Sequence, residues 1–226
     1  MVAASVIGVG LYRITDAAHL AQVPTSTLRS WFKGYSYTYK GRRFTRPPRW
    51  TTQIDPASAV VGFLDLVEAR IIGLFRREGV RWSTIAAARE AAGARFGVSY
   101  PFATFRLLTD GRSIIHEVGK NANDRVLVEI ATTQRVFDPM MRPYFIQLDT
   151  RDDIAIRWWP MGKRREVVLD PERAFGKPIV NSFGIPTSIL AAAVRGQGSP
   201  EAAARWFEVS VSAVRDAVEF EHRRAA

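Results

Sequence analysis

The apolar residues near the amino terminus recur at the spacing of an α-helix. Ala17, Leu20 and Ala21 stand at positions i, i+3 and i+4, which predicts a short helix that begins at the capping residue Thr15. The pair Val23-Pro24 ends this pattern, because a residue before proline is disfavoured in the helical conformation. A tight turn is therefore expected after a short first helix.

A second helical pattern follows directly, over residues 25–33. Leu28, Trp31 and Phe32 fall on one stripe of it, and Gly34 stands where glycine commonly ends a helix. Two short helices that are joined by a tight turn predict a helix-turn-helix.

The pattern changes in residues 35–50, YSYTYKGRRFTRPPRW, where aromatic and polar side chains alternate. Alternation indicates a β-strand, because successive side chains of a strand point to opposite faces. Lys40-Gly41 supplies a turn and Pro47-Pro48 stops the second run, so this segment predicts a β-hairpin. A basic hairpin that follows the second helix of a helix-turn-helix is a wing.

The middle of the chain reads first as helix and then as β-structure. Helical spacing returns in residues 60–79 and 83–97, which predicts a pair of helices. In FRLLTDGRSIIHE, Asp110-Gly111 lies between two apolar runs, a strong signal for a two-residue hairpin. RVLVEIA and IAIRWW add two expected strands, and a hairpin turn accounts for the acidic cluster Asp149, Asp152 and Asp153.

A stretch rich in proline, glycine and arginine, residues 158–178, marks a boundary, and helices are expected at about 187–195, 200–207 and 211–222. Ser199 and Ser210 are the expected caps of the last two, which form a second helix-turn-helix-like pair. The pattern thus predicts an α+β fold, mainly α, in three domains. These are a winged helix-turn-helix with a second helix pair, a central layer of β-hairpins and a helical carboxyl-terminal domain, at residues 8–98, 99–160 and 161–226.

Charge and composition narrow the class of partner. The chain has 226 residues, with 32 Lys and Arg against 22 Asp and Glu, a net charge of +10. A polyanion such as DNA, RNA or an acidic membrane surface is therefore the leading partner class. The absence of cysteine excludes disulfides, cysteine-based metal sites and thiol catalysis and suits a reducing compartment. No apolar run approaches the length of a membrane span, so we expect a soluble, cytoplasmic protein without a membrane partner.

The candidate DNA-binding residues lie on the second helix and on the hairpin. The second helix of a helix-turn-helix enters the major groove with its amino end first, so small hydroxyl side chains in its first turn reach phosphates or base edges. Arg29 can bind guanine through two hydrogen bonds or hold a phosphate. From Arg29 to Trp50 every charged residue is basic. We expect DNA contacts from Thr25, Ser26, Thr27, Arg29, Lys33, Lys40, Arg42, Arg43 and Arg46. The alternative is a solvated basic loop whose aromatic residues serve only the small core.

Other chemistry is not favoured by the sequence. His19, His116 and His222 are scattered rather than paired at metal-ligand spacing. No set of residues assembles a nucleophile, a base and an oxyanion site. We therefore expect no metal, no cofactor and no catalytic activity. A nucleic-acid enzyme is kept as an alternative that cleavage by the purified chain with magnesium would favour.

Two stretches carry a resemblance to known families. ITDAAHLAQVPTSTLRSWFKG, residues 14–34, resembles the MerR-type winged helix, and the likeness extends over about residues 11–97. In residues 167–220, the segments DP, AFGKP and GIPT and the helix pair after them resemble the small helical domain of antitoxins that pair with PIN-fold ribonuclease toxins. With GFLDLVEAR and LLTDGR between them, the whole chain is similar to VapB-type antitoxins.

This resemblance implies two activities. The chain would hold a cognate VapC-type PIN-fold toxin inactive and, as a homodimer, would bind the promoter of its own operon. On the positions of this sequence, it assigns the DNA-contacting roles to Thr25, Ser26, Thr27, Arg29, Lys33, Arg42 and Arg43. The chain lacks the long coiled coil and the cysteines of many MerR-type sensors, so metal sensing is not expected.

Two alternatives stay open. The chain could be a free-standing transcription regulator whose carboxyl-terminal helices dimerise. Those helices could also form a second reading head, with Ser210, Ser212 and Arg215 at DNA. Their five carboxylates would repel phosphate, which favours dimerisation.

Overall fold

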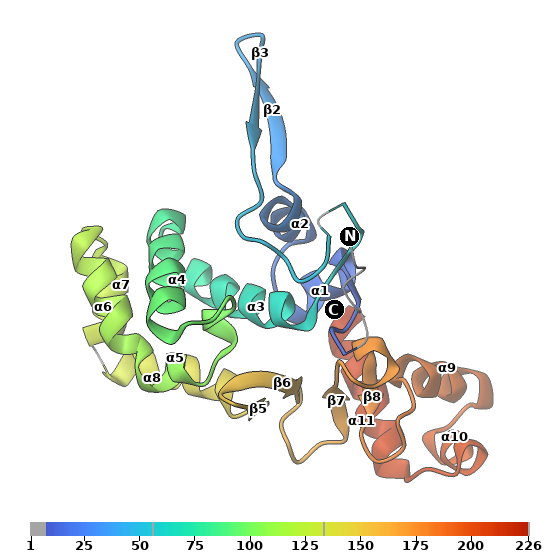
Figure 1. Cartoon of the computed structure of the whole chain (residues 1–226). Coiled ribbons are helices and arrows are strands. Elements are labelled where there is room, and N and C mark those ends of the chain that lie inside the picture. The colour runs from blue at the N-terminus through green and yellow to red at the C-terminus, as the bar shows by residue number, and fades with distance from the viewer. Residues whose placement is uncertain (1–7, 56, 133, 226) are drawn as a thin grey trace. The chain divides into compact units, whose positions relative to one another are not determined.

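The computed structural model in Figure 1 describes residues 8–55, 57–132 and 134–225 of the chain. These residues divide into two compact units. The N-terminal unit comprises Tyr12–Phe145 with Thr150–Ala155. The C-terminal unit comprises Ile146–Asp149 and the residues from Ile156 onward, with the described residues before Tyr12. Helices predominate over a few short strands, which confirms the α+β, mainly α fold.

The N-terminal unit opens with the expected helix-turn-helix. Helix α1 spans Ile14–Ala21 and helix α2 spans Thr25–Lys33. Gln22 ends α1 in the left-handed conformation, and the N–H of the next residue returns to the carbonyl oxygen of Ala18 at 3.0 Å. Thr15 lies inside α1 rather than capping it, because the helix begins one residue earlier, next to strand β1.

The expected hairpin follows α2. Strands β2 (Tyr35–Tyr39) and β3 (Arg42–Arg46) pair antiparallel, and Lys40 and Gly41 form a turn with φ of 48° and 74°. Positive φ at both central residues is typical of the two-residue turn that matches the twist of a hairpin. In Figure 1 the hairpin extends away from α2, and all ten of its strand residues are exposed.

Two longer helices form the centre of this unit. Strand β1 (Tyr12–Arg13) pairs with β4 (Val60–Val61), which leads into α3 (Phe63–Arg77); α4 (Trp82–Phe96) follows. The predicted helix pair is thus confirmed. Residues from the length of α3 are buried, and Phe75 packs on Phe102 of the short helix η1 (Pro101–Ala103), with ring centroids 5.9 Å apart.

The next segment corrects the sequence-based expectation. The predicted hairpin around Asp110-Gly111 and the predicted strand over residues 125–131 are wrong. The chain forms α5 (Arg106–Thr109), α6 (Gly111–Asn121) and α7 (Arg125–Thr132), and then α8 (Gln134–Phe145).

Close packing explains why Gly111 begins a helix and does not form the expected hairpin turn. Asp110 has φ of −109°, whereas the expected hairpin turn needs positive φ at both central residues. A Cβ on Gly111 would lie 2.7 Å from Cδ1 of Leu107, so glycine permits α5 and α6 to approach closely. Ile114 and Ile115 are both buried on α6, which packs against α7. Runs of two apolar residues do not distinguish a strand from a buried helix.

A four-stranded sheet follows in the order β5-β6-β7-β8. Its strands are β5 (Leu148–Arg151), β6 (Ile154–Trp158), β7 (Val167–Leu169) and β8 (Pro178–Val180), with the short helix η2 (Ala174–Gly176) between the last two. Strand β6 confirms the prediction from IAIRWW. Asp152 and Asp153 have φ of 51° and 66° in the turn before it, as the hairpin interpretation of the acidic cluster requires.

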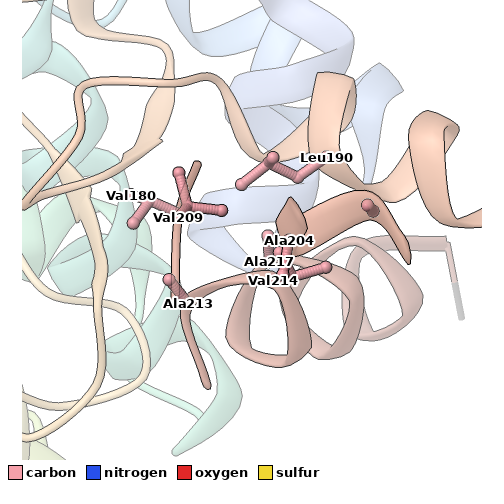
Figure 2. Packing of buried hydrophobic residues seen from close by; sticks show 8 residues of the cluster. Val180, Leu190, Ala204, Val209, Ala213, Val214 and Ala217 are labelled. Atoms are coloured by element: carbon pink, nitrogen blue, oxygen red, sulfur yellow. The ribbon is translucent and has the colours of Figure 1, made fainter. Parts of the chain in front are cut away.

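The carboxyl-terminal helices agree with the sequence. They are α9 (Thr187–Gln197), α10 (Pro200–Phe207) and α11 (Val211–Ala225). Ser199 and Ser210 accept hydrogen bonds from backbone N–H groups three residues ahead, at 3.1 Å each, and thus act as the predicted caps. Figure 2 shows the hydrophobic cluster in which these helices pack with β8; it consists of Val180, Leu190, Ala203, Ala204, Val209, Ala213, Val214 and Ala217.

The boundaries of the three predicted domains stay a prediction. Ala226, the final residue of the third, lies outside the described residues.

Candidate nucleic-acid interface

Helix α2 is held by one apolar stripe. Leu28, Trp31 and Phe32 are buried, with exposed fractions of 0%, 6% and 1%. The residue before the helix is Pro24, which gives the first turn no side-chain cap. The N–H groups of that turn are therefore available to an anion, and the helix dipole favours negative charge at this end.

The structure places all nine predicted DNA-binding residues on α2 or on the hairpin. Thr25 and Thr27 are half-buried in the first turn of α2. The other seven are exposed: Ser26, Arg29, Lys33, Lys40, Arg42, Arg43 and Arg46.

Gly34 sets the connection between the two parts of this surface. Its φ is 67°, in the left-handed region, and a Cβ at this position would collide with the carbonyl oxygen of Arg46. Any side chain would therefore push the end of β3 away from the end of α2. The N–H of Arg49 donates to the carbonyl oxygen of Trp31 at 2.7 Å and fixes the returning chain on α2.

Three tryptophans anchor this returning chain. Trp31 and Trp82 have ring centroids 5.4 Å apart, and Trp50 stacks on Trp82 at 6.5 Å. Nε1 of Trp50 donates to Asp65 Oδ1 at 3.2 Å. These contacts join the end of the hairpin to α3 and α4, so the wing rests on the core of the unit.

Two buried carboxyl groups support the same region. Asp65 accepts the N–H groups of Gln53 and Gly62 at 3.0 Å, and burial raises its pKa. Glu68, also fully buried, accepts from Arg89 Nε at 2.7 Å, and burial raises its pKa to about 7 against the opposing influence of Arg89. Their roles are structural, because both side chains are inaccessible to solvent.

The hairpin aromatics do not belong to the core. Tyr35, Tyr37, Tyr39 and Phe44 are 45%, 39%, 59% and 41% exposed. The rings therefore do not serve the small core of the unit, as the alternative required, whereas a basic hairpin that is merely solvated stays open. Their neighbours in the hairpin are basic or hydroxylated, so the wing presents both rings and positive charge to solvent.

A cavity of about 300 Å³ lies beside the first turn of α2. Thr27 and Trp82 line it with three arginines, Arg49, Arg76 and Arg77. The guanidinium of Arg76 donates to the carbonyl oxygen of Val80 at 2.6 Å, and that of Arg77 donates to the carbonyl oxygen of Gln22 at 3.1 Å. Because carbonyl oxygens carry no net charge, these hydrogen bonds orient the two side chains without neutralising them.

Sequence reasoning missed these three arginines. Arg49 was visible as part of the basic run, but Arg76 and Arg77 lie far along the chain at the end of α3. They lie close to α2 only because the helices pack together in the folded unit. The resulting cavity presents positive charge next to the uncapped helix end, which suits a phosphate group.

The described residues show neither a metal site nor a membrane-spanning helix. Within them, no three His, Cys, Asp or Glu side chains are grouped so that they could hold a metal ion. In the same part of the chain, no helix combines the length and the apolar character needed to cross a membrane.

Comparison with known proteins agrees with this geometry. Residues 10–89 match the family described as "Putative DNA-binding HTH domain". The chain is 25% identical over 224 residues to "Putative antitoxin VapB45" of Mycobacterium tuberculosis, covering 93% of each protein. The chain resembles a VapB-type antitoxin with an N-terminal helix-turn-helix domain. The resemblance to VapB-type antitoxins that the sequence predicted is thus confirmed.

The fold has a counterpart among solved structures. The crystal structure of Rv2018 from Mycobacterium tuberculosis aligns with a TM-score of 0.74 at 23% identity, over 94% of this chain and 99% of that one. The chain therefore shares its fold with a solved structure over most of its length.

Proposed function

We propose that this protein is an antitoxin that binds the operator DNA of its own operon and neutralises a PIN-fold ribonuclease toxin. The observation that carries the DNA-binding part is the set of exposed basic residues on α2 and the wing, where every charged residue from Arg29 to Arg49 is basic. The name of the M. tuberculosis relative supports the antitoxin part. On this proposal the protein acts in the cytoplasm as a homodimer and is not an enzyme.

DNA recognition would use two kinds of contact. The first turn of α2 enters the major groove, where Ser26 reaches the backbone and Arg29 reaches a base edge. The arginines of the cavity, with the N–H groups of this turn, hold a phosphate beside the groove. Arg42 and Arg43 on the wing bind phosphates of the flanking backbone, which adds affinity without sequence preference.

Salt dependence tests the wing contacts. We expect the double substitution Arg42→Ala and Arg43→Ala to weaken binding to operator and unrelated duplex DNA alike. It should reduce the slope of log affinity against log salt by about two, because each phosphate contact contributes roughly 0.9. Arg205→Ala, an exposed arginine of α10, is the matched control. An unchanged slope in the double variant would remove the wing from the DNA surface.

Neutralisation needs a separate experiment. The product of the adjacent reading frame should co-purify with this protein, and its ribonuclease activity should fall when the protein is present. If no complex forms while salt-sensitive operator binding is retained, the protein is instead a free-standing regulator with the same DNA surface.

A further inference from the structure

The two faces of the wing hairpin differ sharply. In the antiparallel register, Tyr35, Tyr37 and Tyr39 lie opposite Arg46, Phe44 and Arg42. Directly opposed residues share a face, so four aromatic rings and two arginines lie on the same side of the hairpin. We call this side the aromatic face; its residues are Tyr35, Tyr37, Tyr39, Arg42, Phe44 and Arg46.

The rings of the aromatic face form a row. Tyr37 and Phe44 stack nearly parallel, with centroids 5.4 Å apart and an interplanar angle of 19°. The Tyr35 and Tyr37 ring centroids are 6.0 Å apart. The rings of Tyr35, Tyr37 and Phe44 thus contact one another, and all four rings, Tyr39 included, are between 39% and 59% exposed and leave much of their surface open to solvent.

The opposite face is small and hydroxylated. Ser36, Thr38 and Thr45 share it with Arg43, and the hydroxyl groups of Ser36 and Thr45 lie 3.1 Å apart. The hairpin thus forms with small hydroxylated side chains on one side, so strand pairing does not by itself require aromatic residues. The aromatic residues are therefore gathered on one side, and a cluster of exposed rings of this kind marks a binding surface.

Charge selects the class of partner. The aromatic face carries Arg42 and Arg46, and the segment between Arg29 and Arg49 contains no acidic residue. A second copy of the hairpin would bring like charges together, whereas a polyanion is attracted. Exposed aromatic rings on a β-surface with flanking arginines stack on the bases of single-stranded nucleic acids, whose π-faces are open. The bases of a duplex already stack on each other, so a ring can stack on them only after a base step is unstacked, which costs free energy.

The geometry points to a second nucleic-acid site on this protein: the aromatic face binds single-stranded DNA or RNA, with bases stacked on Tyr37 and Phe44 and phosphates held by Arg42 and Arg46. This site shares Arg42 with the duplex surface, but its aromatic rings go beyond duplex operator binding, which is assigned to α2, the cavity, Arg42 and Arg43. It does not depend on the antitoxin activity.

An abasic probe separates stacking from charge. We would measure binding of the full chain to fluorescently labelled oligothymidylate and oligouridylate of about 12 nucleotides, and to an abasic strand with the same phosphates. The wild-type protein should bind the base-containing strands at least about tenfold more tightly than the abasic strand. An oligodeoxyuridylate strand of the same length, which differs from oligouridylate only in the sugar, decides between DNA and RNA.

Variants of the two faces provide the matched controls. Tyr37→Ala with Phe44→Ala should lose most of the preference for base-containing strands and keep the affinity for the abasic strand. Thr38→Ala with Thr45→Ala, on the opposite face, should keep both. Tyr37→Leu with Phe44→Leu keeps apolar bulk without an aromatic ring and should behave as the alanine pair, which guards against a general loss of the hairpin. Phe44→Tyr should retain binding.

Three results would overturn this site. Equal wild-type affinity for abasic and base-containing strands would reduce it to phosphate binding. Unchanged preference in the Tyr37 and Phe44 variants would place stacking elsewhere. A change in sedimentation of these variants with unchanged oligonucleotide affinity would make the aromatic face a contact between copies. Operator duplex binding, measured in parallel, reports the proposed function separately, because it should depend on Arg29 and not on the rings.

Discussion

The helix pairs α1–α2 and α10–α11 make the same turn at opposite ends of the chain. Gln22 and Glu208 follow the first helix of each pair in the left-handed conformation, with φ of 56° and 54°. The next residues, Val23 and Val209, are buried, and each donates its N–H to a carbonyl oxygen of the preceding helix at 3.0 Å. The two pairs therefore share the backbone geometry of a helix-turn-helix.

Their surfaces differ in charge. Arg29 follows Gln22 at the same interval at which Arg215 follows Glu208. Arg29 is exposed in a wholly basic neighbourhood, whereas Arg215 donates to Glu201 at 2.7 Å. The comparison teaches that the turn alone does not make a DNA-reading surface. An arginine that is neutralised within its own domain is a poor partner for phosphate, which favours the structural account of the carboxyl-terminal pair over a second reading head.

The largest expected effect is on stability and comes from comparing one ion pair of the N-terminal unit with one of the C-terminal unit. Glu68 accepts from Arg89 Nε, and Asp216 from Arg165 Nε, both at 2.7 Å. The Glu68 side chain is fully buried, whereas those of Arg165 and Asp216 are 37% and 12% exposed. We expect Glu68→Ala to lower the free energy of unfolding by about 3–5 kcal/mol, because it strands a largely buried guanidinium. Asp216→Ala should cost about 1–2 kcal/mol in the same denaturant titration. If the two variants lose the same free energy of unfolding, burial does not decide how much each ion pair contributes to stability.

The pH dependence of stability should follow Glu68. Burial raises its pKa to about 7, above its ordinary value of 4.5, so the folded state binds this proton more tightly than the unfolded state. Its stabilising contribution is therefore complete below pH 4.5 and is lost as the pH rises through 7, by roughly 3 kcal/mol in all.

Glu68→Gln, which cannot ionise, should reduce this slope in unfolding free energies measured between about pH 5 and pH 8 and leave only the contribution of Asp65, whose pKa is also raised by burial. Asp216→Asn is the control and should retain the full slope. Persistence of the full slope in Glu68→Gln would assign it to another group.

Substitution of Arg29 and of Arg215, which occupy equivalent positions in the two helix pairs, should affect operator binding differently. Arg29→Ala is expected to weaken binding to a promoter fragment about 10- to 100-fold and to relax sequence preference, because it removes a contact to a base edge. Arg215→Ala should change the affinity less than about twofold, since that side chain is paired within the C-terminal unit. Fluorescence anisotropy measures both. A comparable loss in Arg215→Ala would restore the second reading head.

The smallest effect concerns the helix caps. Pro24 and Ser210 occupy equivalent places before α2 and α11, but only Ser210 has a side-chain acceptor, which binds the N–H of Ala213 at 3.1 Å. Ser210→Ala should cost about 1 kcal/mol of stability. Ser26→Ala, at an exposed position of α2, should stay within about 0.5 kcal/mol. Thermal unfolding of the two variants checks the difference.

The sequence by itself determined the elements that depend on neighbouring residues. Lys40-Gly41 formed the expected turn, Gly34 ended α2, and Ser199 and Ser210 capped their helices, because each of these effects acts within a few residues. The exposed basic residues of α2 and the wing were identified for the same reason, since alternation and helical spacing already assign each side chain to a face.

Only the tertiary structure decided the rest. The segment around Asp110-Gly111 became helical because α6 buries Ile114 and Ile115 where it packs on α7, and a local turn signal is weaker than that packing. In the site, Arg76 and Arg77 come from the end of α3 and reach the first turn of α2 only after the helices pack. The pKa of Glu68 likewise depends on burial by distant residues. Hydrophobic packing acts between segments far apart in the chain, so it determines which charges meet and which are buried.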